Sequence, residues 1–215
     1  MLKIAKCQIY LITPPQIHDL DMFADTLENA LKAGPVACLQ IRLKNTTDTG
    51  LLHVTNRLSP TCRAHDTLIL INDRPDLAKV CRADGVHIGQ GDMDCFSSRK
   101  LLDEGAIIGV TCHNSRELAF KAAGAGADYV AFGAFFDTPT KSPGTWADVE
   151  ILQWWSETVE VPCVAIGGIT VKNARTIIET GAAFIAVSSG VWAHPDGPGP
   201  AVSQLHQLCL EHSPS

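Results

Sequence analysis

The chain has 215 residues, of which 46% are hydrophobic and 19% are charged, and its formal net charge at pH 7 is −6. This apolar content can fill a sizeable core, which excludes a disordered tail, a collagen-like repeat and a small disulfide-stabilised scaffold. The acidic balance and the lack of any polybasic stretch argue against a nucleic-acid partner, and no apolar run is long enough to cross a membrane.

Eight cysteines are spread along the chain without a CxxC pair. Some of them lie inside apolar runs, as Cys38 and Cys163 do, where a reduced thiol packs as a small hydrophobe. A zinc site would need clustered ligands, and the N-terminal residues lack the pattern of a secretory signal peptide. We therefore expect a soluble, cytoplasmic protein with reduced thiols.

Short apolar runs alternate with helical segments along the chain. The runs are predicted to be strands, and in chain order they cover residues 7–13, 37–44, 67–72, 85–88, 107–111, 129–136, 162–166 and 184–188. Helices are predicted at 19–33, 46–58, 115–125, 148–159, 171–180 and 201–210, with room for only a brief helix at 74–82 and a loop at 194–200. Apolar strands that alternate with helices are typical of parallel βαβ units covered on both faces.

The number of these units predicts the fold. Eight strand–helix units favour an α/β fold, a (β/α)8 TIM barrel, formed by residues 1–215 as a single domain. A doubly wound open sheet is the alternative, and it would need one strand fewer or an edge strand. In a barrel, the carboxyl ends of the strands carry the chemistry, so polar residues at those positions are candidate site residues.

The second predicted strand carries three polar residues in alternation. Because successive side chains of a strand point in opposite directions, Gln40, Arg42 and Lys44 are expected on one face and the apolar residues between them on the other. If the apolar face meets the helices, an amide and two cations point inward, which is costly unless an anionic or polar group answers them. An edge strand with a solvated face is the alternative.

Two aspartates follow neighbouring predicted strands. Asp73 comes after the third strand and Asp92 after the fourth, so the two carboxylates are expected to converge at one rim of the barrel. Beside inward cations, they favour a hard divalent ion, most simply Mg²⁺ bridging to phosphate oxygens. The alternative is that each aspartate makes local turn and cap hydrogen bonds.

The last three strands lead into segments suited to phosphate. The sixth is followed by hydroxyls and a lysine on a proline-containing loop, the seventh by Gly167 and Gly168, and the eighth by Ser188 and Ser189. Phosphate sites of such barrels are often built from the loops after strands seven and eight. His87 and His113 are weaker candidates, with structural roles favoured.

Seven segments carry a resemblance to a known family. They read QIRLK at 40–44, INDR at 71–74, ADGVHIGQGD at 83–92, IGVTCH at 108–113, TPTK at 138–141, AIGGI at 165–169 and AVSS at 186–189. With these motifs in this order, the chain resembles thiamine-phosphate synthase over almost its whole length. The resemblance implies a TIM barrel that joins 4-amino-2-methyl-5-hydroxymethylpyrimidine diphosphate to hydroxyethylthiazole phosphate. It also implies a dissociative reaction that releases thiamine phosphate and pyrophosphate.

Residue roles are carried over by the same resemblance. It implies that the pyrimidine diphosphate is bound by Gln40, Ile41, Arg42, Leu43, Lys44, Asn72, Thr111 and Lys141, of which Arg42, Lys44, Thr111 and Lys141 are the catalytic candidates. It implies that Mg²⁺ is held by Asp73 and Asp92. The thiazole phosphate would be bound by Thr138, Pro139, Thr140, Gly168, Ser188 and Ser189. The partners are therefore small phosphorylated molecules, and members of the family commonly pair, with Trp154, Trp155 and Trp192 as candidate interface residues.

Four positions depart from the family pattern. Leu43 and Gly91 stand where acidic residues are common, Thr111 replaces a serine, and Ser188 replaces an apolar residue. None of these removes a charge that the reaction needs, although substrate affinity is left open. Two other functions remain alternatives. One is a metal-independent isomerase similar to a thiazole tautomerase of the family, and the other is a non-catalytic phosphate-binding barrel.

Overall fold

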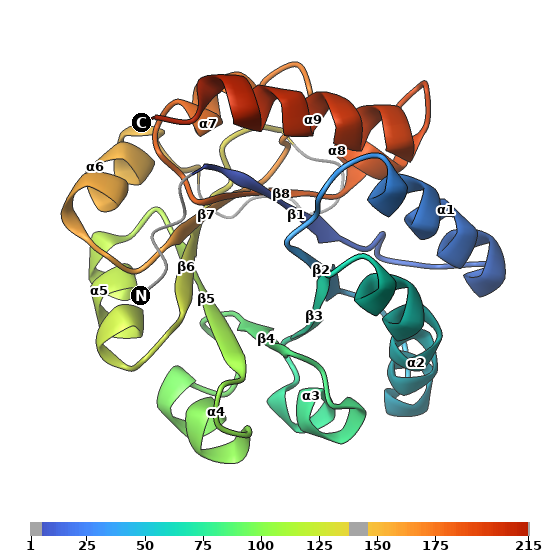
Figure 1. Ribbon diagram of the computed structural model, residues 1–215. Helices are drawn as coiled ribbons and strands as arrows, with labels where there is room; N and C mark the ends of the chain where they lie inside the picture. Colours follow the sequence, from blue (N-terminus) through green and yellow to red (C-terminus); the bar gives the residue numbers. More distant parts are fainter. Residues whose placement is uncertain (1–5, 138–145, 215) are drawn as a thin grey trace.

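Eight parallel strands close into a barrel in sequence order, with helices packed around it (Figure 1). The computed structural model describes residues 6–137 and 146–214. The strands are β1 Gln8–Ile12, β2 Cys38–Ile41, β3 Leu68–Asn72, β4 Gly85–Ile88, β5 Ile107–His113, β6 Tyr129–Phe132, β7 Cys163–Ile166 and β8 Phe184–Val187. Since β1 pairs with β8, with Gln8 opposite Phe184, the sheet is closed. This confirms the predicted TIM barrel and excludes the open sheet.

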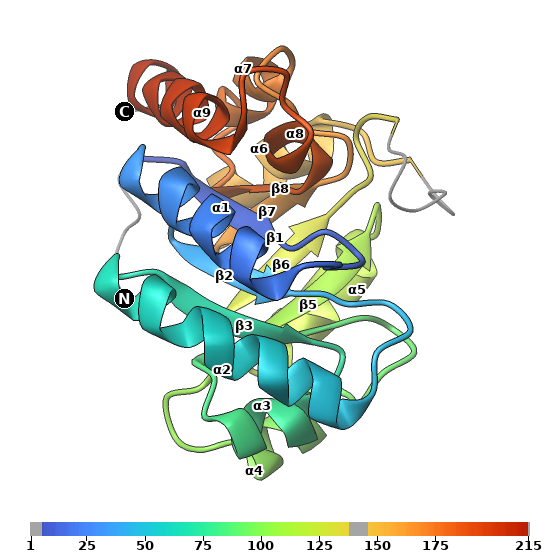
Figure 2. The ribbon, with the colours of Figure 1, turned by 90° about the vertical axis from the view of Figure 1, so that its right-hand side faces the viewer.

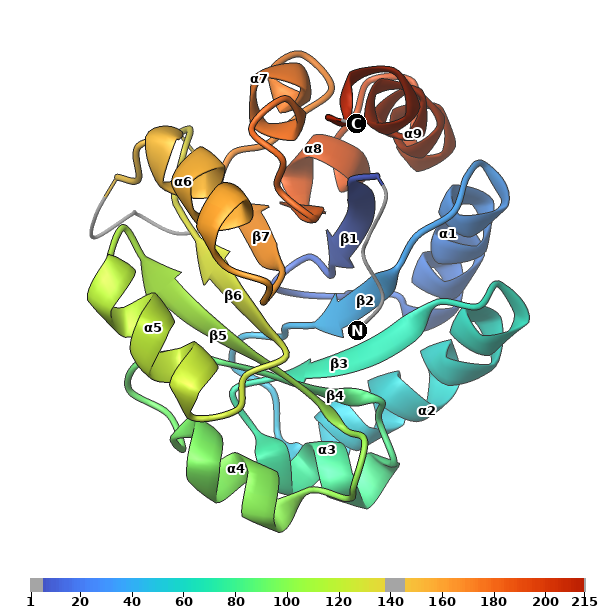
Figure 3. The ribbon, with the colours of Figure 1, turned by 60° about the vertical axis from the view of Figure 1, so that its left-hand side comes forward.

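Helices cover the outside of the barrel, as the end view in Figure 3 shows. In the described residues they are α1 Leu20–Lys32, α2 Asp48–Ala64, α3 Pro75–Cys81, α4 Cys95–Leu101, α5 Arg116–Gly124, α6 Glu150–Thr158, α7 Ala174–Ile178, α8 Ser189–Trp192 and α9 Pro198–His212. None of these helices is long and apolar enough to span a membrane.

Polar side chains fix where many of the helices begin. Asp19, Thr47, Asp94 and Ser115 each accept a hydrogen bond from a backbone N–H in the first turn of the helix that follows. Such caps satisfy donors that have no partner within the helix. The segments before α1, α2, α4 and α5 therefore carry their own helix start signals, which fix where the preceding loops end.

The core has two layers, one outside the barrel of strands and one inside it. A large apolar layer lies between the strands and the helices. A second layer fills the interior, and it includes Tyr10, Leu70, Tyr129 and Val164. Because side chains fill the interior, the barrel is not a channel. The loops that follow β1 and β2 leave together at one end of the barrel, on the right in Figure 2.

Several element ends differ from the predictions for identifiable reasons. β2 stops at Ile41 rather than residue 44, because the Arg42 N–H donates to Thr13 Oγ1 (2.9 Å) and the chain leaves the sheet there. β6 ends at Phe132, four residues early, and β5 continues to His113. The last helix begins at Pro198, inside the predicted loop, because proline fits the first turn of a helix. The short helix α8 was not predicted.

Two of the three tryptophans proposed for a subunit interface make contacts within the chain. Trp155 is fully buried, and its Nε1 donates to the Val161 carbonyl (2.7 Å). Trp192 packs against Phe23 and donates to the Ile12 carbonyl (2.7 Å). These contacts give no support to an interface role for Trp155 and Trp192, and the pairing of two chains stays a prediction. Trp154 is half-buried under the Arg116 guanidinium.

Candidate active site

A cavity of about 430 Å³ opens at the carboxyl ends of the strands. Each of the eight strands supplies at least one lining residue, either from its last positions or from the loop that follows. The sequence-predicted residues that line the cavity are Gln40, Arg42, Asn72, Asp73, Asp92, Thr111, Gly168, Ser188 and Ser189. The barrel therefore brings most of the predicted set into one place.

Other predicted residues lie outside this group. Ile41 is buried in the layer between the strands and the helices, and Leu43 packs against the same layer. Lys44 is exposed in the loop after β2, where its backbone N–H donates to the Pro15 carbonyl (2.8 Å). The expectation that Lys44 shares the inward face of the strand with Gln40 is therefore wrong. The predictions at Thr138, Pro139, Thr140 and Lys141 fall outside the described residues.

Asp73 and Asp92 form a carboxylate pair at the rim of the cavity. Burial, together with a hydrogen bond to Asp92 and repulsion from it, raises the pKa of Asp73 to about 6, although Arg42 acts in the opposite direction. The Asp92 Oδ2 also accepts from the Gly89 N–H (2.8 Å), which fixes its orientation. Two carboxylates held this close repel each other unless a proton or a cation lies between them. The pair thus has the chemistry of a hard-cation site.

The rest of such a coordination shell would come from outside the protein. In the described residues, no group of three His, Cys, Asp or Glu side chains could hold a metal ion. Mg²⁺ is commonly bound by one or two carboxylates, with water and phosphate oxygens completing an octahedral shell. The two carboxylates therefore fit Mg²⁺ that arrives with a phosphorylated ligand, and they do not form an all-protein metal cage.

A chain of buried polar side chains crosses the barrel beneath the cavity. Gln40 Nε2 donates to the Tyr10 hydroxyl (2.6 Å), which lies 3.0 Å from the Tyr129 hydroxyl. Tyr129 in turn contacts His87 Nδ1 (2.9 Å), and His87 Nε2 contacts Thr111 Oγ1 (2.8 Å). Burial, and then the positive charge of Arg42, lowers the pKa of His87 to about 4, so its ring is neutral near pH 7.

On the opposite side of the cavity, backbone atoms of two neighbouring loops lie close to each other. Gly168 has a φ of +67°, and a Cβ at this position would lie 2.4 Å from the Asp137 carbonyl oxygen and 2.5 Å from that of Phe136. Asn173 holds the same loop, since its Oδ1 accepts from the Thr170 N–H (2.7 Å) and its Nδ2 donates to the Gly168 carbonyl (3.0 Å). Only glycine fits this turn without strain, so exposed backbone can approach an anion here.

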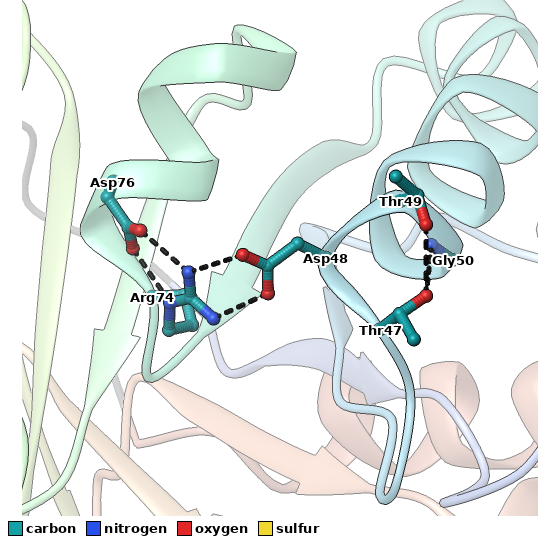
Figure 4. Close-up of polar contacts among 6 residues, drawn as sticks. All are labelled: Thr47, Asp48, Thr49, Gly50, Arg74 and Asp76. Carbon is teal, nitrogen blue, oxygen red and sulfur yellow. Dashed lines mark hydrogen bonds and ion pairs between the residues drawn. The ribbon is translucent and has the colours of Figure 1, made fainter.

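Arg74, next to Asp73, joins the two helices that start beside the site (Figure 4). Its guanidinium bonds both carboxylate oxygens of Asp48 at 2.8 and 3.0 Å, and both of Asp76 at 2.9 and 2.7 Å. Asp48 begins α2 and Asp76 lies in the first turn of α3. The loops after β2 and β3, which carry Arg42 and Asp73, are thus tied together at their far ends.

Replacing Arg74 by methionine should lower the free energy of unfolding by about 1 kcal/mol, because half-exposed ion pairs contribute little and Asp48 and Asp76 would be left facing each other. The loss should shrink in about 1 M NaCl, where such charges are screened. Denaturant titration at low and high salt measures both. The matched control is Arg57→Met, which removes a single exposed pair with Asp21. A stability loss for Arg74→Met that is independent of salt would argue against this tie.

Some residues that line the cavity, and two tyrosines beneath it, were not predicted from the sequence. Ile12, Gln90 and Ala134 line the cavity without having been predicted, and His87 and His113 line it as well. His87 was expected to have a structural role, and its two side-chain hydrogen bonds join β4 to Tyr129 of β6 and Thr111 of β5. Tyr10 and Tyr129 were not singled out. The available signal was a phenol among the buried apolar residues of each of two strands.

Comparison with known proteins decides the family. Residues 9–191 match the family model described as thiamine monophosphate synthase. The chain belongs to this family. The predicted resemblance is therefore confirmed, as is the enzyme class, a transferase of thiamine biosynthesis.

Relatives of the thiamine monophosphate synthase family match the chain over nearly its full length. It is 54% identical over 202 residues to the thiamine-phosphate synthase of Rhodospirillum centenum, covering 94% of this chain and 97% of that protein. It is 46% identical over 207 residues to the thiamine-phosphate synthase of Hyphomonas neptunium, covering 94% of each. The solved thiamine phosphate pyrophosphorylase from Pyrococcus furiosus superimposes with a TM-score of 0.84 at 31% identity, over 97% of this chain and 98% of that one.

Proposed function

We propose that the protein joins 4-amino-2-methyl-5-hydroxymethylpyrimidine diphosphate to hydroxyethylthiazole phosphate, yielding thiamine phosphate and pyrophosphate. The observation that carries this proposal is the two-sided cavity. Arg42, Asp73 and Asp92 lie on one side, which suits a diphosphate with its metal ion, and Gly168 and Ser189 lie on the other, which suits a monophosphate. The family and the relatives named above support the same reaction.

Mg²⁺ is the metal ion that we propose for the Asp73–Asp92 pair. Bound there, it would help to neutralise the negative charge that develops on the departing diphosphate. Asp73 and Asp92 would orient the diphosphate through this charge, and Arg42 would bind its oxygens directly. Lys44 and Lys141 are proposed, from the family resemblance, to add positive charge on the same side.

The chemistry that we propose is dissociative. The bond between the methylene carbon and the diphosphate oxygen breaks, and its electron pair leaves with the diphosphate. The thiazole nitrogen then donates its lone pair to the methylene cation, which forms the new C–N bond without any proton transfer. The residues therefore need to align two substrates and offset charge, and the site needs no strong general base. Burial lowers the pKa of His87 to about 4, which makes its ring a weak base and agrees with this requirement.

Product analysis by mass spectrometry tests the proposal and separates it from the alternatives. We expect thiamine phosphate only when both substrates and Mg²⁺ are present, and none in excess EDTA. Conversion of a thiazole carboxylate phosphate alone, undiminished by EDTA, would replace the transferase with an isomerase. Tight binding of either phosphorylated compound without turnover would point to a non-catalytic barrel.

The location of the protein in the cytoplasm and the pairing of two chains are also proposals.

A further inference from the structure

The hydrogen-bonded chain beneath the cavity links residues that the reaction uses to residues that it does not. Gln40 and Thr111, its two ends, line the cavity, as does His87. Tyr10 and Tyr129 lie one layer deeper, in the interior core, and are 2% and 6% exposed. The five side chains come from five different strands, so the barrel fixes their spacing. No role in binding or catalysis has so far been given to the two tyrosines.

Donor and acceptor can be assigned for each hydrogen bond of this series, starting from Gln40. The Gln40 Nε2 can only donate, so the Tyr10 oxygen accepts from it. The only other described partner of the Tyr10 hydroxyl is Tyr129, so Tyr10 satisfies its own hydrogen by donating to the Tyr129 oxygen. The opposite arrangement would leave the Tyr10 hydrogen buried without an acceptor, which costs free energy. Burial also raises the pKa of both phenols, which keeps them protonated.

The direction continues through His87 to Thr111. Since the Tyr129 oxygen accepts from Tyr10, its hydrogen goes to His87 Nδ1, which is therefore the unprotonated ring nitrogen. His87 then carries its hydrogen on Nε2 and donates it to Thr111 Oγ1. The Thr111 hydroxyl keeps its own hydrogen for a group in the cavity. At the other end, the Gln40 carboxamide has committed its Nε2 to Tyr10, so its Oε1 is left for a ligand.

Packing holds the central links in place. The Tyr129 ring stacks on the His87 ring at a centroid distance of 5.7 Å and meets the Tyr10 ring edge-on at 6.0 Å. It lies so close to β5 that a Cβ at Gly109 would be 1.8 Å from its Cζ. Glycine at this position therefore makes room for the phenol, and the ring cannot move toward β5.

We propose that Tyr10, Tyr129 and His87 are positioning residues, which present the Gln40 Oε1 as a fixed acceptor and the Thr111 hydroxyl as a fixed donor to the pyrimidine ring. This inference rests on the function proposed above, because that function supplies the ring. An aminopyrimidine has the complementary groups, an amino N–H that donates and ring nitrogens that accept. The three residues do not touch the reacting atoms, so they act on binding and alignment rather than on bond breaking.

The variant Tyr129→Phe removes the central hydroxyl and keeps the ring that packs against Gly109. We expect the KM for the pyrimidine diphosphate to rise roughly 10- to 100-fold, as when a buried hydrogen-bond partner is lost, while the KM for the thiazole phosphate stays within about twofold. The matched control is Thr55→Val, which deletes a buried hydroxyl that donates to the Leu51 carbonyl within α2 and does not line the cavity. It should leave both KM values unchanged.

A second readout needs no substrate. The ¹⁵N chemical shifts of the His87 ring, assigned by their loss in His87→Gln, should show Nδ1 unprotonated and Nε2 protonated in the wild type at neutral pH. In Tyr129→Phe the two tautomers should become mixed, because Nδ1 has lost its donor. If Tyr129→Phe does not fold, Tyr10→Phe cuts the neighbouring link and should shift the same KM selectively.

The outcomes separate this inference from the proposed function. A wild-type His87 protonated on Nδ1 would overturn the donor-to-acceptor direction assigned to the hydrogen bonds between Gln40 and Thr111. An unchanged KM in Tyr129→Phe, or an equal rise in both KM values, would overturn the positioning role. A wild type that binds the pyrimidine diphosphate in calorimetry but forms no product would contradict the proposed function alone, and weaker binding by Tyr129→Phe would then still support the positioning role.

Discussion

Replacing Asp92 by asparagine should lower kcat roughly 100- to 1000-fold, because in the proposed reaction the departing diphosphate would lose much of the charge stabilisation, worth several kcal/mol, that the carboxylate pair would provide with the proposed metal ion. The substitution keeps the shape of the side chain, and its oxygen can still accept from the Gly89 N–H. Removing one of two carboxylates that repel each other should leave Tm unchanged or higher. Steady-state kinetics at saturating Mg²⁺, together with thermal unfolding, measure both effects.

The control for this variant is Asp103→Asn, a strongly exposed carboxylate whose nearest described cation, Lys79, is 4.0 Å away. It should leave kcat and Tm as they are. A kcat for Asp92→Asn within about threefold of the wild type would mean that the carboxylate pair does not take part in turnover. A collapse of Tm would assign Asp92 a structural role instead.

Replacing Gly168 by alanine should impair the other side of the cavity. The added Cβ would meet two carbonyl oxygens at 2.4 and 2.5 Å, in a backbone conformation with a φ of +67°. We expect the free energy of unfolding to fall by about 1–3 kcal/mol from strain and overpacking. The KM for the thiazole phosphate should rise about tenfold, the equivalent of 1.4 kcal/mol, while the KM for the pyrimidine diphosphate changes little.

Gly124→Ala is the matched control, because no atom beyond its chain neighbours and its own helix backbone lies within 4 Å of the added Cβ, and the residue ends helix α5. Alanine should be neutral there, or stabilising by about 0.5–1 kcal/mol. Denaturant titration and the two KM values compare the variants. If Gly168→Ala raised the pyrimidine KM as much as the thiazole KM, the division of the cavity into two sides would be wrong.

The fold and part of the site could be predicted because both follow from local pattern. Eight apolar runs of strand length imply eight parallel strands, and their neighbour relations place Asp73 near Asp92 without any further information. Alternation along β2 put Gln40 inside the barrel, where it is 2% exposed. These inferences need only the period of the side chains and the order of the strands.

The errors have a different physical origin, because they depend on contacts between distant segments. Lys44 was placed on a strand that ends at Ile41, where the Thr13 side chain takes the Arg42 N–H. The pairing of Tyr10 with Tyr129 joins residues 119 positions apart and is set by closure of the barrel. In both cases the local sequence does not reveal which distant residue is the partner.

The most direct test of the account is pyrophosphate release, measured with both substrates and then with each omitted, in Mg²⁺ and in excess EDTA. We expect release only when the pyrimidine diphosphate, the thiazole phosphate and Mg²⁺ are present together, in an amount equal to the thiamine phosphate formed. Release that is unaffected by EDTA would contradict the proposed metal site at Asp73 and Asp92. No release under any condition would contradict the proposed reaction itself.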